Sequence, residues 1–297
     1  MESNKPIHAQ RLIVEEGSPT DVLGKPFSIF SKYVKIFGLY FGATKNSPDE
    51  KLLHGASVLY QYIDNDDDGI PDNDAVYSAL LSRNATMIMF ADEKELRSHK
   101  KFFRANEKCK DVHVQDLQAD ETFPGCIMPY EFDASLEECF HLVTEGYSIA
   151  YPDVFGYQRG SSVSAMLDNA RGGFFKKVPK RYPEHAWFTY YDKTCDYESM
   201  IVEYIYWAMT TILGAQQHRK CEIEEEWRPC TCAELQEYDS AIFSLLTDPN
   251  YKFPTKLPQP LDCVPLHVVG TRVRSGSGSS TGSGSSSDSS YEGYKKK

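Results

Sequence analysis

The sequence predicts an α+β fold, in which a mainly helical domain contains a small sheet, one helix–loop–helix unit and a disordered C-terminal tail. Several segments carry apolar residues at helical spacing, whereas residues 33–42 and 86–90 have the aromatic and β-branched composition of strands. From Ser275 onward the chain consists largely of serine and glycine, which provide almost no apolar surface to bury.

The composition indicates one large domain. The chain has 297 residues, of which 41% are hydrophobic and 13% are aromatic, enough for a packed core. We predict an extended lead-in over residues 1–32, a single globular domain over residues 33–271 and the disordered tail over residues 272–297. The net charge of −11 argues against nucleic acid and anionic membrane surfaces as partners and favours metal ions. No apolar run is long enough to span a membrane.

The compartment depends on the true start of the protein. The first residues lack the apolar stretch of a signal peptide, so the chain as it stands is predicted to be cytoplasmic. It would be secreted if the N-terminus were processed or incomplete. The eight cysteines form an even number, as a disulfide framework requires, but they are sparse for this length. Reduced thiols in the core are the alternative.

A short amphipathic helix is predicted over residues 134–146. Glu137, Glu138, His141 and Glu145 fall within one arc of this helix, and apolar residues occupy the other. Glu137-Glu138-x-x-His141 has the spacing of the H-E-x-x-H zinc helix, with Glu in place of the first His. On this interpretation Glu137 and His141 bind zinc, and Glu138 is the catalytic base that polarises the attacking water. The alternative is that the arc is the solvated face of the helix.

A second helix, predicted over residues 199–214, is apolar nearly all round and therefore belongs in a core. Its only charged residue is Glu203. A buried carboxylate must be protonated, paired or bound to a metal, because burying it charged and unpaired is costly. Glu203 is therefore the predicted third zinc ligand. The alternative is a hydrogen bond to a buried tyrosine, to His185 or to an arginine.

Residues 64–74, D-N-D-D-D-G-I-P-D-N-D, are the most specific motif. Aspartates at loop positions 1, 3, 5 and 9 and glycine at position 6 reproduce the first part of an EF-hand calcium loop. Ala75 stands where the EF-hand has its bidentate glutamate, so Asp72, Asp74 or a carboxylate from elsewhere in the chain must close the shell. An acidic exposed turn is the alternative, although so many adjacent aspartates would repel one another. The predicted Ca²⁺ ligands are Asp64, Asp66, Asp68, Asp72 and Asp74.

With these motifs in order, the chain resembles a little-characterised group of calcium-loop proteins that pair one aspartate-rich loop (DNDxDGxPDN) with a zinc-peptidase-like EExxH helix. The resemblance covers about residues 33 to 255 and includes Tyr151-Pro-Asp-Val-Phe-Gly156 and the segment from Cys195 to Trp207. Glu138, His141 and Glu203 add a distant similarity to Glu-type zinc peptidases, which implies a zincin-like domain.

Two functions follow as hypotheses. The first is a calcium-binding, zinc-dependent hydrolase of peptide or other acyl bonds, with a peptide or protein as substrate. The second is a non-catalytic, calcium-stabilised binding or extracellular structural protein, built on a zincin scaffold that has lost its site. The two differ in whether the Glu203 carboxylate lies within reach of His141.

Overall fold

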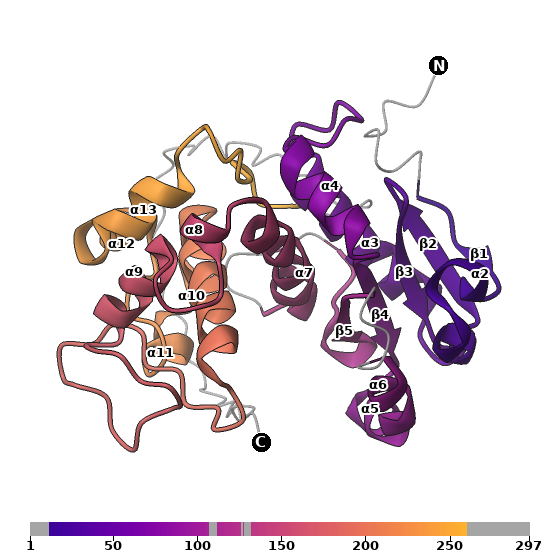
Figure 1. The fold of residues 1–297 in the computed structure, drawn as a ribbon, viewed down its shortest axis with the longest axis horizontal. Helices are drawn as coiled ribbons and strands as arrows, with labels where there is room; N and C mark the ends of the chain where they lie inside the picture. Colours follow the sequence, from indigo (N-terminus) through magenta and orange to yellow (C-terminus); the bar gives the residue numbers. More distant parts are fainter. Residues whose placement is uncertain (1–11, 107–111, 126, 128–131, 260–297) are drawn as a thin grey trace, which may run out of the picture. The chain divides into compact units, whose positions relative to one another are not determined.

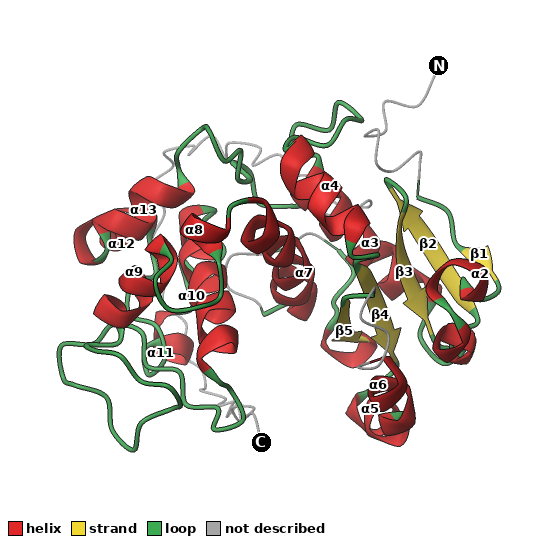
Figure 2. Ribbon diagram, viewed as in Figure 1, coloured by secondary structure: helices red, strands yellow, loops and turns green. Residues whose placement is uncertain are grey.

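The computed structural model describes residues 12–106, 112–125, 127 and 132–259, which all belong to one compact unit spanning Met1–Val264. The class is α+β, as predicted: within this unit a five-stranded sheet with its helices lies to one side, and a group of helices lies to the other (Figure 1 and Figure 2). The tail predicted over residues 272–297 lies outside the described residues. Within the described part of the chain, no helix is long and apolar enough to cross a membrane.

The sheet has the strand order β1-β2-β3-β4-β5. The first three strands are antiparallel, whereas β3, β4 and β5 run parallel to one another. Phe37 and Gly38 connect β2 to β3 with φ of 49° and 89°, and positive φ at both central residues is typical of a two-residue hairpin turn. The strands are β1 (Glu15–Glu16), β2 (Lys32–Ile36), β3 (Leu39–Ala43), β4 (Thr86–Phe90) and β5 (Val114–Gln118).

Two segments contain more regular structure than the sequence predicts. Strand β5 and the short 3-10 helix η2 (Ala119–Glu121) have no counterpart among the elements predicted from the sequence. In β5 only Leu117 is buried, so the strand lacks the apolar alternation by which strands are recognised. Residues 12–32, expected to be an extended lead-in, contain β1, helix α2 (Thr20–Leu23) and the 3-10 helix η1 (Lys25–Ile29).

The principal helices include those predicted over residues 134–146 and 199–214, with shifted ends, and the two of the predicted helix–loop–helix unit. They are α3 (Asp49–Ile63), α4 (Asp74–Ser82), α7 (Ala134–Ala150), α9 (Ser162–Ala170) and α10 (Tyr197–Ile212). No side chain caps α3, and the hydroxyl of the nearby Ser47 donates to the carbonyl of Met89 at 3.2 Å. The remaining short helices are α5 (Glu93–Ser98), α6 (Lys100–Asn106), α8 (Pro152–Phe155) and α11 (Lys220–Ile223).

The last two helices described are α12 (Cys232–Tyr238) and α13 (Ser240–Leu246), which a single residue separates. Asp239 interrupts the helix with φ −143° and caps α13, because its carboxylate accepts the Ile242 N–H at 3.2 Å. The same side chain accepts hydrogen bonds from Tyr204 and Trp187. This buried contact with α10 compensates for the lost helical turn.

Helix α7 lies at the centre of the core. It packs against α3, α4 and β5, and also against α10 (Figure 1). Gly146 permits its close approach to α4, since a Cβ there would lie 2.8 Å from the Val76 Cγ1. The cysteines whose side chains are described, Cys139, Cys195, Cys230 and Cys232, are free thiols. Because α7 packs against α10, the helix with the predicted zinc motif lies against the apolar helix that carries Glu203.

Candidate metal centre

Glu137 and His141 extend from α7, and Glu203 extends from α10. Asp133 starts α7 by accepting the Ser135 N–H at 2.9 Å, and Asp196 starts α10 by accepting the Ser199 N–H at 3.0 Å. These caps set the register of both helices. Glu137 and His141 are four residues apart, so their side chains lie one above the other on the face that meets α10.

The two helices bring the three predicted zinc ligands together, and we call this cluster the metal centre. One ligand atom from each of Glu137, His141 and Glu203 lies within 4.8 Å of the others. The His141 Nε2 is 3.9 Å from the Glu203 Oε2, and in the described part of the chain it has no hydrogen-bond partner. The three residues are 8%, 8% and 9% exposed. Glu137 and His141 are therefore buried, and the alternative that the polar arc of α7 is a solvated face is wrong for these two residues.

The charges of the metal centre favour a cation. Burial by itself lowers the pKa of His141, but the negative charges of Glu203, Glu138 and Glu137 outweigh burial and raise this pKa to about 9. Without a metal ion, the imidazole is therefore protonated at neutral pH and balances part of the carboxylate charge. A metal ion bound at Nε2 would replace that proton.

Two tyrosines border the metal centre. The Tyr190 hydroxyl donates to the Glu203 Oε1 at 3.3 Å, so the alternative partner expected for Glu203, a tyrosine, is present. The ring of Tyr206 meets the His141 ring edge to face, with centroids 5.6 Å apart. Burial, followed by the charges of Glu203 and Glu137, raises the pKa of Tyr190. Tyr190 therefore keeps its proton and acts as a hydrogen-bond donor.

Glu138, the predicted catalytic base, contacts the other ring nitrogen of His141. Its Oε2 lies 3.5 Å from the His141 Nδ1 and accepts a hydrogen bond from the Gln115 Nε2 at 2.5 Å. Its side chain is 25% exposed. Sequence reasoning did not single out Gln115, because β5 was not recognised as a strand. His185, an alternative partner for Glu203, is exposed.

The donor set suits a divalent transition metal. One imidazole nitrogen and two carboxylates occur in zinc sites, and imidazole also suits iron, nickel and copper. Ligand atoms about 2.0–2.2 Å from a tetrahedral ion would lie roughly 3.4 Å from one another. The observed separations therefore require side-chain movements of about 1 Å. Three protein ligands leave one position of a tetrahedral ion for water or substrate, as catalytic zinc sites do.

The calcium loop, residues 64–74, brings three of its five predicted ligands together. Carboxylate oxygens of Asp64, Asp66 and Asp72 lie within 4.8 Å of one another. The Asp68 carboxylate accepts the Ile70 N–H at 2.8 Å, and Asp74 is exposed in the first turn of α4. Burial raises the pKa of both Asp64 and Asp72, backbone N–H groups lower it, and neighbouring aspartates raise it further.

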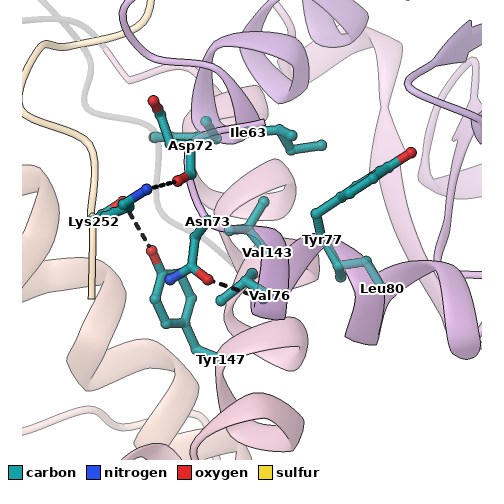
Figure 3. Close-up of a pocket in the computed structure, with 10 residues that line it drawn as sticks. Ile63, Asp72, Asn73, Val76, Tyr77, Leu80, Val143, Tyr147 and Lys252 are labelled. Atoms are coloured by element: carbon teal, nitrogen blue, oxygen red, sulfur yellow. Dashed lines mark hydrogen bonds between the residues drawn. The ribbon is translucent and has the colours of Figure 1, made fainter. Parts of the chain in front are cut away.

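The calcium loop also holds the C-terminal arm, which we define as residues 248–259. The Asn65 side-chain oxygen accepts the N–H groups of Thr255 and Lys256 at 2.9 and 3.0 Å. Lys252 donates to the Asp72 carbonyl at 2.7 Å (Figure 3). Beneath these contacts lies a small cavity, lined by Tyr147 and Asn73 among others. The space in which the centre of a water molecule can move within it is about 10 Å³. It has room for about one water and none for a substrate.

Comparisons with protein-family models, with curated proteins and with solved structures found no match for this chain. The resemblances to calcium-loop proteins and to zinc peptidases therefore stay predictions from the sequence. The geometry of the metal centre and of the calcium loop is therefore the basis for a function.

Proposed function

We propose that the chain is a metal-dependent hydrolase of peptide or other acyl bonds, with zinc bound by Glu137, His141 and Glu203. One observation carries the proposal: a buried imidazole nitrogen without a hydrogen-bond partner in the described chain faces carboxylates from two helices. A buried polar atom of this kind is costly unless it binds something. The surrounding negative charge selects a cation.

The roles of the side chains follow from their positions. A zinc ion would supply a Lewis acid that polarises a carbonyl group and makes water acidic. Glu137, His141 and Glu203 would hold the ion, and Tyr190 would restrain Glu203 through its hydroxyl. Glu138 is partly exposed and Tyr190 is half-buried. A substrate would have to reach the buried metal centre past these two side chains.

Elemental analysis of protein loaded with zinc and then dialysed tests the metal centre. We expect about one zinc ion per chain in the wild type and none in His141→Ala or Glu203→Ala, because two protein ligands hold zinc poorly. Glu145→Ala is the matched control: Glu145 lies one turn further along α7, where it faces His113. It should keep the zinc. Zinc retained in both ligand variants would refute the proposed centre.

A hydrolysis assay then separates a catalytic from a non-catalytic metal centre. The zinc-loaded wild type, the chelated wild type and Glu203→Ala are compared on peptide and ester libraries. Activity that requires zinc and Glu203 supports the hydrolase. Stoichiometric zinc with no zinc-dependent cleavage would favour the non-catalytic function, in which the ion only ties α7 to α10.

We further propose that the calcium loop binds Ca²⁺ and stabilises the fold. The support is the convergence of Asp64, Asp66 and Asp72 within a loop of EF-hand spacing. Gly69 has φ of 90°, and glycine adopts such a conformation without strain. Since the loop hydrogen-bonds to the C-terminal arm, a bound ion would also support the arm.

Calcium is expected to raise the melting temperature. At about 100 times its Kd, a ligand of the folded state adds about 2.7 kcal/mol, or roughly 5–10 °C for a domain of this size. Asp66→Asn should remove this shift, because it deletes an exposed member of the cluster. Asp67→Asn removes one negative charge from the neighbouring residue, which is outside the cluster. This variant should keep the calcium-dependent shift in melting temperature. A wild type that melts at the same temperature with calcium and with chelator would refute the calcium proposal.

A further inference from the structure

A hydrogen-bonded pair of side chains lies against the imidazole on the side away from Glu203. The Gln115 Nε2 donates to the Glu138 Oε2 at 2.5 Å, and this same oxygen is 3.5 Å from the His141 Nδ1. An ionised carboxylate accepts hydrogen bonds and cannot donate them. The Gln115 amide must therefore present its NH₂ group, and an imidazole that donates to the same carboxylate would do so with its proton on Nδ1.

The fold determines this arrangement from two elements. Gln115 lies on β5, where it pairs with Met87 of β4 in a parallel register. Leu117, two residues along β5 on the same face, is buried in the core that α7 shares. Helix α7 packs along β5, and it presents Glu138 three residues before His141, on the same side of the helix. The position of Glu138 is thus fixed by its own helix and by the strand.

We infer that Gln115 and Glu138 are positioning residues for His141: Gln115 anchors the Glu138 carboxylate, and Glu138 accepts the Nδ1–H of the imidazole. A neutral imidazole carries one N–H. Holding that proton on Nδ1 leaves the lone pair on Nε2, the nitrogen that faces Glu203. This inference rests on the proposed metal centre. It gives Glu138 a role in orienting a ligand, in place of direct contact with water or substrate.

The alternative is that the Gln115–Glu138 hydrogen bond, which joins β5 to α7, only stabilises the fold. Such a bond would affect stability, with no effect on which nitrogen of His141 binds the metal or on how tightly it binds. Partners that orient a metal-binding histidine contribute about 10–100-fold to metal affinity. Affinity and tautomer therefore distinguish the two roles.

The test measures zinc affinity by chelator competition in the full chain. Glu138→Gln should weaken zinc binding by about 10–100-fold, and Gln115→Leu by up to about 10-fold because it only loosens Glu138. Two controls make the same chemical changes nearby. Gln118→Leu lies on the same strand, and Glu145→Gln lies on the same helix facing His113. Both should bind zinc as the wild type does.

Nitrogen-15 NMR of labelled histidine supplies the second readout, with the His141 signals assigned by their loss in His141→Gln. In the zinc-loaded wild type, the proton should reside on Nδ1 and the metal on Nε2. Variants that bind zinc as tightly as the two controls would overturn the positioning role and leave the metal centre standing. A proton on Nε2 in the zinc-loaded protein would overturn the metal centre as well, because Nε2 is the nitrogen that faces Glu203. A wild type that binds no zinc would overturn both.

Discussion

The stability of the metal-free protein is expected to fall as the pH is raised from about 6.5 to about 9. The pKa of His141 rises on folding from 6.5 to about 9, so the folded state holds this proton more tightly than the unfolded state does. The contribution is therefore fully present below pH 6.5 and is lost as the pH rises through about 9. At about 1.4 kcal/mol per pKa unit, the contribution of His141 to the free energy of unfolding is roughly 3 kcal/mol.

Urea unfolding at a series of pH values, in the presence of a chelator, measures this effect. His141→Gln should remove the fall in the free energy of unfolding between pH 6.5 and about 9. His113→Gln is the control. Burial lowers the pKa of His113 despite the nearby Glu145, so its contribution is lost on the acid side of 6.5. An equal fall in His141→Gln would show that other groups cause it.

Phe253→Ala is expected to lower the free energy of unfolding by about 3–5 kcal/mol, as other buried phenylalanines do. Phe253 is 6% exposed and anchors the C-terminal arm. Its ring stacks on Tyr147 of α7 with centroids 4.0 Å apart and planes 6° apart, and it meets the Phe155 ring edge to face. Truncation would remove this packing and leave a cavity beneath the arm.

Urea unfolding again supplies the measurement, and Tyr238→Ala is the control. Tyr238 is also aromatic and lies in the C-terminal part of the chain, but it is 46% exposed. Its truncation should change stability by no more than about 0.5 kcal/mol. If Phe253→Ala were as mild as this control, the arm would not be an integral part of the core.

Helix α7 connects the two candidate ion sites. Glu137 and His141 lie in its first half, and Tyr147 lies in its second half, where the Tyr147 hydroxyl donates to the Tyr251 carbonyl of the arm at 3.1 Å. Lys252, the next residue of the arm, donates to the calcium loop at Asp72. The arm therefore links the predicted calcium loop to the helix that carries two of the three candidate metal ligands.

Helical periodicity made part of the metal centre predictable. Glu137 and His141 are four residues apart in an amphipathic segment, so any helix there places them on one face. Glu203 is the single charged residue in the apolar segment 199–214, and burial of such a carboxylate demands a partner. The loop aspartates follow a spacing that itself describes ion coordination. In each case the information lies within one continuous stretch of chain.

Contacts between distant segments could be decided only by the tertiary structure. The polar arc of α7 can face water or another helix, and only packing against α10 shows that Glu137 and His141 are buried. Strand β5 has one buried residue, so pairing with β4 makes it a strand. Only that pairing brings Gln115 to Glu138. The sequence alone thus determined which side chains share a helix face or a loop, because local geometry sets those spacings, whereas the encounter of separate elements depends on how the whole core packs.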